Sequence, residues 1–127
     1  MPEITVLYAG LLGLMSLVIS FKAGSLRGKL NVSIGDGGHQ ELLLAMRRHA
    51  NFVEYVPLTL LVIALLEMNG GPLLATHILC AGLVVSRTAH AVGLKADTMQ
   101  GAGRIIGAGG TALVLLVASV WAIVVYF

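Results

Sequence analysis

Four long apolar blocks, separated by three polar connections, constrain the fold of this chain more than any other feature. The blocks cover about residues 4–21, 41–67, 72–92 and 104–127. Each is long enough to cross the hydrocarbon core of a bilayer, which takes about 20 helical residues. Within that core, only helices and closed barrels satisfy their own backbone groups. The pattern therefore predicts an all-α integral membrane protein, with residues 1–127 forming a single bundle of four transmembrane helices.

Composition supports this class and excludes several others. The chain is 57% hydrophobic and only 11% charged, whereas a soluble domain carries about 25% charged residues. Its net charge of +2 comes from scattered basic residues, so we expect no nucleic-acid partner. Cys80 is the only cysteine, which rules out an intrachain disulfide and a cysteine-based metal site; we expect no metal. The start of the chain, Met1-Pro2-Glu3, lacks basic residues, so the first block is interpreted as a retained helix.

The connections predict how the chain is oriented in the membrane. Basic residues of the first and third connections, and of the edge of the fourth block, are Lys22, Arg27, Lys29, Lys95 and Arg104. The middle connection has Glu67 and no basic residue. Because short cytoplasmic loops carry an excess of lysine and arginine, we expect both basic connections in the cytoplasm and both termini outside it.

Glycines mark a turn and a packing surface. The run Gly35-Asp36-Gly37-Gly38 in the first connection is a turn signal. Small residues recur along one side of the fourth block, at Gly103, Gly107, Gly109, Gly110 and Thr111. In membrane helices such residues allow close helix packing.

The second block carries an unusual group of polar side chains. At a helical advance of about 100° per residue, Arg47, Asn51 and Glu54 share one face. Arg48 and Tyr55 flank that face. Ionisable groups inside a membrane segment cost about 2.5–3.5 kcal/mol each by insertion scales, and they tend to face other helices, water or a ligand. This helix is therefore predicted to form the wall of a polar site.

The third block extends the same polar cluster, because Arg87 and His90 share a face near its end. One interpretation is that Glu54 simply pairs with Arg47 or Arg87 and neutralises buried charge. However, the cluster has more cations than one carboxylate can neutralise, and arginine is suited to bidentate carboxylate binding. The surplus predicts an anionic ligand with a cationic part. Glutathione, with two carboxylates, an ammonium and a thiol, has this character.

The pattern Arg47-x-x-x-Asn51-x-x-Glu54-Tyr55-x-Pro57 resembles the signature of the MAPEG family, membrane-associated proteins in eicosanoid and glutathione metabolism. Arg87-x-x-His90 and Arg104 extend the resemblance over the third and fourth blocks. The local amino-acid sequence is most similar to that of the small bacterial branch of the family. The resemblance implies a homotrimer in the bacterial inner membrane, with glutathione held between subunits near the cytoplasmic side. The implied activity is a glutathione-dependent transferase or peroxidase acting on lipophilic electrophiles that arrive from the membrane lipid.

Carried over by position, the resemblance also implies a set of site residues. Arg104 would be catalytic, holding glutathione as its thiolate. The glutathione-binding residues would be Arg27, Arg47, Asn51, Glu54, Tyr55, Arg87 and His90. Two departures from the eicosanoid enzymes argue against eicosanoid substrates: Leu94 stands where those members place a tyrosine, and Ile105 where the prostaglandin enzyme has a serine.

Three other functions are alternatives. A non-catalytic family member that binds a ligand or acts as a scaffold is the main one. A small transporter is disfavoured, because the first block carries no charge and the polar groups gather at one membrane face instead of the midplane. A haem-binding bundle using His49 and His90 is disfavoured, because His49 points away from the face of Arg47.

Overall fold

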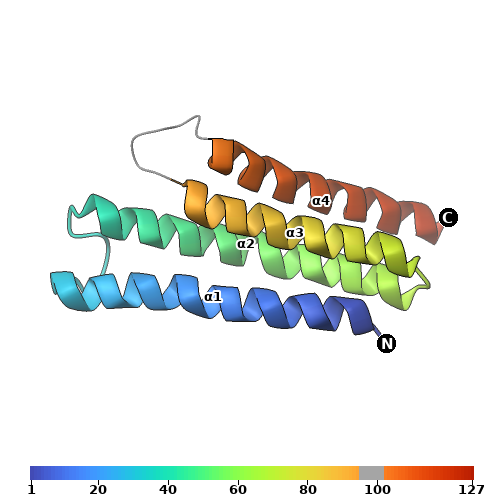
Figure 1. The fold of residues 1–127 in the computed structure, drawn as a ribbon, viewed down its shortest axis with the longest axis horizontal. Coiled ribbons are helices and arrows are strands. Elements are labelled where there is room, and N and C mark those ends of the chain that lie inside the picture. The colour runs from blue at the N-terminus through green and yellow to red at the C-terminus, as the bar shows by residue number, and fades with distance from the viewer. Residues whose placement is uncertain (95–101) are drawn as a thin grey trace.

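The computed structural model describes residues 1–94 and 102–127, which form four α-helices. Helix α1 spans Glu3–Leu30, α2 spans Gln40–Met68, α3 spans Leu73–Gly93 and α4 spans Ala102–Tyr126. All four are long and apolar enough to cross a membrane. The helices run side by side, and both termini lie at the same end of the bundle (Figure 1). The predicted four-helix membrane bundle is therefore confirmed.

The bundle has α2 and α3 at its centre and α1 and α4 on its two flanks (Figure 1). Helices α3 and α4 form the most extensive contact, and α1 packs on both α2 and α3. Within the described chain, α1 and α4 do not touch each other. Because α4 packs on both α2 and α3, these three helices can surround a site among them.

Helix α1 continues nine residues beyond the apolar block predicted for it, to Leu30 instead of residue 21. The apolar block marks where the membrane-embedded part ends, whereas the helix itself continues through Gly24, Ser25 and Gly28 as far as Leu30. Asn31 then ends the helix in the left-handed conformation, with φ of 54°. Arg27 and Lys29 in the last turn are favourably placed at the negative end of the helix dipole.

The predicted turn in the first connection is confirmed. Gly35, Gly37 and Gly38 all have positive φ, between 58° and 80°, a region that glycine adopts without steric cost. The Asp36 side chain accepts a hydrogen bond from the Gly38 N–H at 3.1 Å, and its carbonyl accepts one from the His39 N–H at 2.9 Å. This compact turn leads directly into α2.

A buried carboxylate joins the end of α2 to the start of α1. Glu67 accepts hydrogen bonds from the backbone N–H groups of Ile4, at 2.8 Å, and Thr5, at 2.9 Å. The Thr5 hydroxyl donates a third, at 2.6 Å. Because α1 has no side-chain cap of its own at Pro2, Glu67 satisfies N–H groups that would otherwise lack partners. A negative charge at this position is also favourable for the helix dipole.

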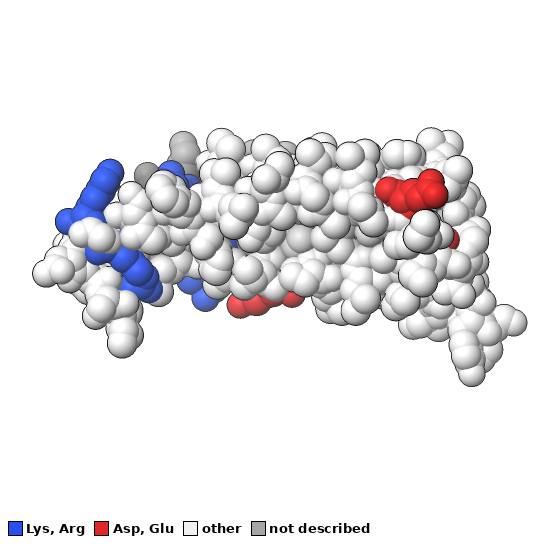
Figure 2. Space-filling view, turned by 90° about the horizontal axis from the view of Figure 1, so that it is seen from below, with Lys and Arg blue, Asp and Glu red and all other residues white. Residues whose placement is uncertain are grey.

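Charged side chains are unevenly distributed along the bundle. Lysine and arginine atoms gather toward the end at which α1 finishes, while acidic atoms appear at the opposite end and midway along this face (Figure 2). Lysine and arginine atoms thus gather at the end that carries the first connection, whose basic residues support the predicted orientation (Figure 2). Lys95, the basic residue cited for the third connection, lies outside the described residues.

Candidate functional site

A cavity of about 270 Å³ lies between α2, α3 and α4 toward the basic end of the bundle. Four of the predicted site residues line it: Arg47, Asn51, His90 and Arg104. Its remaining lining residues are Gln40, Leu43, Leu44, Leu94 and Ala108. The structure thus brings two arginines, an amide and a histidine from three helices to one cavity, which we call the arginine cavity.

Helical periodicity explains the α2 wall of the arginine cavity. Gln40, Leu44, Arg47 and Asn51 follow one another at spacings of three or four residues, so they occupy one side of α2. The shared face predicted for Arg47 and Asn51 is therefore confirmed. Extending the same spacing backwards would have found Gln40 and Leu44 from the sequence.

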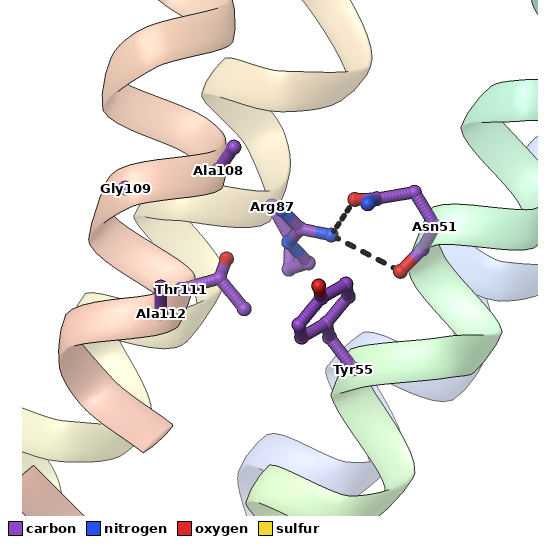
Figure 3. A pocket seen from close by; sticks show the side chains of 7 residues that line it. All are labelled: Asn51, Tyr55, Arg87, Ala108, Gly109, Thr111 and Ala112. Carbon is purple, nitrogen blue, oxygen red and sulfur yellow. Dashed lines mark hydrogen bonds between the residues drawn. The ribbon is translucent and has the colours of Figure 1, made fainter. Parts of the chain in front are cut away.

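A second cavity, of about 310 Å³, adjoins the first, since Asn51 and Ala108 line both. We call it the inner cavity. It brings together Tyr55 and Asn51 from α2, Arg87 from α3 and a small-residue surface of α4 (Figure 3). The α4 residues are Ala108, Gly109, Thr111 and Ala112. The two cavities thus adjoin between α2 and α4, and the inner cavity adds Tyr55 and Arg87 to walls that are otherwise largely apolar.

Arg87 joins the three helices around the inner cavity. Its side chain is 2% exposed. One terminal nitrogen donates to the Asn51 Oδ1 at 2.7 Å (Figure 3). The other terminal nitrogen donates to the Gly107 carbonyl at 3.0 Å. The Nε atom is buried and has no hydrogen-bond partner among the described residues. Arg87 therefore donates to two neutral oxygens and does not form the ion pair with Glu54 that was considered from the sequence. These neutral acceptors leave the positive charge of Arg87 unneutralised.

Glycines on α4 allow this helix to approach α3 closely. A Cβ atom built on Gly107 would lie 2.5 Å from the Cα of His90, and one built on Gly103 would lie 2.7 Å from the Cα of Gly93. A Cβ on Gly110 would overlap the Ser86 hydroxyl. The predicted packing surface is confirmed at these three positions. It is wrong for Gly109, which has no atom within 4 Å of a Cβ position and instead lines the inner cavity.

Two predicted site residues lie away from the cavities of this single chain. Glu54 is exposed and lines neither the arginine cavity nor the inner cavity. Arg27 lies in a separate hollow between α1 and α2, shared with His49. There it donates to the carbonyl oxygens of Ser33 at 3.3 Å and Gly35 at 2.9 Å.

The two histidines considered as haem ligands lie apart in the structure. His49 lines the hollow between α1 and α2, whereas His90 is buried on the arginine cavity between α2, α3 and α4. Two axial ligands would have to face one common space. The separation removes the basis for a haem site built from these two residues.

Sequence reasoning missed Thr111 as a site residue and Glu67 as a buried carboxylate. Thr111 is 1% exposed and donates to the Gly107 carbonyl at 2.8 Å, the same oxygen that Arg87 contacts. A signal for Glu67 was present, because a carboxylate at the C-terminal end of a helix is unfavourable for the helix dipole. Its presence there indicates a partner elsewhere in the fold.

The fold and the cavities define a small membrane protein of four helices, with a cationic site between helices α2, α3 and α4. The chain belongs to the MAPEG family: a sequence model of that family matches residues 5–124. It is 34% identical over 119 residues to the inner membrane protein YecN of Escherichia coli K12 and, equally, of strain O6:H1. These alignments cover 93% of this chain and 91% of each relative. No solved structure matches the chain significantly.

Proposed function

We propose that this protein binds glutathione in the arginine cavity and uses its thiolate to conjugate or reduce lipophilic electrophiles. The observation that carries the proposal is the presence of Arg47, Asn51, His90 and Arg104 on one cavity. Two guanidinium groups on the cavity favour the carboxylates of the tripeptide, since arginine binds carboxylates in a bidentate geometry. Membership of the MAPEG family supports the same ligand class.

Arg104 is proposed to stabilise the reactive thiolate. A free thiol has a pKa of about 8.5, and the thiolate is the nucleophile. A guanidinium stays protonated at all physiological pH values, so Arg104 acts as a fixed positive charge and not as a base. Each unit by which it lowers the pKa of the bound thiol corresponds to about 1.36 kcal/mol.

Two reactions are consistent with a stabilised thiolate. In conjugation, the sulfur forms a bond to an electrophilic carbon, and the leaving group departs with its electron pair. In peroxide reduction, the thiolate sulfur attacks one oxygen of the hydroperoxide and the O–O bond breaks. This gives a sulfenic acid and an alkoxide, and the alkoxide takes a proton from water to become the alcohol. A second glutathione then converts the sulfenic acid to the disulfide and water. Both reactions suit a site that opens between membrane helices, where lipophilic substrates are concentrated.

We further propose that a homotrimer completes the site. Glu54 is exposed in the single chain, and Arg27 lies in a different hollow on the α1 side. A neighbouring subunit that brought its Arg27 to the arginine cavity would add a cation that this chain does not supply there. Exposed Glu54 would then be available to accept the glutathione ammonium at the subunit boundary.

The same proposal includes location and orientation. The relatives are inner membrane proteins of Escherichia coli, which supports the bacterial inner membrane for this chain. The lysine and arginine residues at one end of the bundle support a cytoplasmic position for that end (Figure 2). Both termini, at the opposite end, would lie outside the cytoplasm.

The test compares wild type with Arg104→Ala in detergent, using glutathione with either a chloronitrobenzene or a lipid hydroperoxide. Wild type should turn over at least one substrate and show ultraviolet absorbance of the thiolate. Arg104→Ala should lose both while still binding glutathione. Lys29→Ala, which removes an exposed cation at the same end of the chain, should leave turnover unchanged. Unchanged turnover in Arg104→Ala would refute the catalytic role.

A non-catalytic, ligand-binding member is the second candidate, and Leu94 favours it. Leu94 is 8% exposed and lines the arginine cavity, so it places an apolar side chain where the eicosanoid enzymes have a tyrosine hydroxyl. Saturable glutathione binding with no turnover of either substrate would select this candidate.

A further inference from the structure

A third cavity, of about 170 Å³, lies on the other side of α2, between α1, α2 and α3. Its apolar walls include Val18 and Ile19 of α1 and Val92 of α3. Two cations, Lys22 of α1 and Arg48 of α2, also line it. It shares no lining residue with the arginine cavity or the inner cavity. It therefore belongs to neither part of the proposed thiol site.

The positive charge of this cavity is not balanced within its walls. No acidic residue of the described ranges 1–94 and 102–127 lines it. One terminal nitrogen of Arg48 donates to the carbonyl oxygen of Leu94, while its Nε is buried without a hydrogen-bond partner in the described chain. The Lys22 side chain is exposed. Two cations beside an apolar wall are complementary to an anionic amphiphile.

The position of the cavity along the membrane normal indicates that the anionic amphiphile is a membrane lipid. Lys22 is the first charged residue after the apolar block of α1, so the cavity lies where the hydrocarbon core gives way to the headgroup layer. The same end of the bundle carries the gathered lysine and arginine atoms (Figure 2). Basic pockets between transmembrane helices on the cytoplasmic side bind acidic lipid headgroups.

The size of the cavity fits part of a lipid and not a whole one. Pockets that enclose drug-sized ligands measure about 300–1,000 Å³, well above this cavity. Outside it, α1 presents exposed apolar side chains, with Val18 70% exposed and Phe21 78% exposed. An acyl chain can follow this surface while the phosphate lies between the two cations.

We propose that this cavity is a binding site for an anionic phospholipid, with its phosphate held by Lys22 and Arg48 and its acyl chain along α1. The site is separate from the glutathione site and does not depend on it. Occupancy would fix the packing of α1 against α2 and α3 at the cytoplasmic end of the bundle.

The test is native mass spectrometry of the purified protein released from micelles containing equal amounts of phosphatidylglycerol and phosphatidylcholine. Each basic side chain near an anionic lipid surface contributes about fivefold in affinity, so wild type should retain phosphatidylglycerol at least about tenfold over phosphatidylcholine. The double variant Lys22→Gln/Arg48→Gln should retain the two lipids equally. Equal retention by wild type, or undiminished preference in the double variant, would overturn the proposal.

Three controls distinguish this site from a general effect of surface charge and from a free-phosphate site. Lys29→Gln removes an exposed cation of the same helix that does not line the cavity, and it should keep the preference. The charge-conserving variant Lys22→Arg/Arg48→Lys should also keep it, whereas loss there would overturn the role of charge. Inorganic phosphate added in excess should not displace the lipid, and displacement would identify a free-phosphate site instead.

Discussion

The Arg87 guanidinium donates to the Asn51 side-chain oxygen at 2.7 Å, linking α3 to α2 inside the membrane-spanning bundle. This contact is built entirely from a cation and a neutral amide. Hydrogen bonds to charged groups contribute about 1.5–3 kcal/mol, and leaving such a buried group unsatisfied costs its desolvation as well. The pair therefore holds in place Asn51, the α2 residue that lines both the arginine cavity and the inner cavity.

Replacing Asn51 by alanine should destabilise the bundle, because Arg87 would lose its closest acceptor. We expect the free energy of unfolding, measured by titration with sodium dodecyl sulfate in mixed micelles, to fall by about 1.5–3 kcal/mol. Asn51→Asp, which keeps an oxygen at this position, should retain most of the stability. An Asn51→Ala protein as stable as wild type would show that the contact is dispensable.

A methyl group added at Gly107 should force α3 and α4 apart, because a Cβ there would lie 2.5 Å from the Cα of His90. Overpacking of this kind costs about 1–3 kcal/mol, and we expect Gly107→Ala to lower the midpoint of thermal unfolding in micelles. Gly109→Ala is the matched control, since its Cβ would meet no atom within 4 Å. Equal unfolding midpoints for the two variants would contradict the close approach at Gly107.

Removing the charge of Glu67 should loosen the start of α1. In Glu67→Gln the amide oxygen can still accept a hydrogen bond from one of the backbone N–H groups of Ile4 and Thr5. The amide NH₂ group would then lie opposite the other N–H group, and two donors cannot form a hydrogen bond with each other. We expect faster hydrogen exchange at residues 4–8 and a loss of about 1–3 kcal/mol in the free energy of unfolding. Glu3→Gln, which removes an exposed carboxylate from the first turn of the same helix, should change both quantities less, since an exposed charge near a helix N-terminus contributes only about 0.3–1 kcal/mol. Unaltered exchange in Glu67→Gln would rule out the capping role.

Much of the fold could be predicted from the sequence because membrane helices depend on long apolar blocks, which a linear sequence displays directly. The ends of the helices are less visible. The apolar block of α1 stops at Phe21, yet the helix continues to Leu30, since hydropathy records depth in the membrane and not backbone conformation. The small residues of α4 likewise predicted close packing, but only the helix rotation decides that Gly107 faces α3 while Gly109 faces a cavity.

Sequence periodicity could predict only which residues of the candidate site share a face of the same helix. Periodicity placed Arg47 and Asn51 on one face, and both line the arginine cavity. Glu54 shares that face but lies about 10 Å from Arg47 along α2, at about 1.5 Å per residue, where its side chain is exposed. The choice of Asn51 over Glu54 as the acceptor for Arg87 depends on how α2 and α3 are offset along their axes. That offset arises from packing and leaves no local signal.

The binding of glutathione by the cations of the arginine cavity is most directly tested by isothermal titration calorimetry. Glutathione is titrated into the purified protein in nanodiscs, with Arg47→Gln beside wild type. We predict saturable binding to wild type and a weakening of about tenfold or more in Arg47→Gln, since a charged hydrogen bond contributes about 1.5–3 kcal/mol. No binding heat from wild type, or equal affinity in the two proteins, would contradict glutathione binding at this cavity.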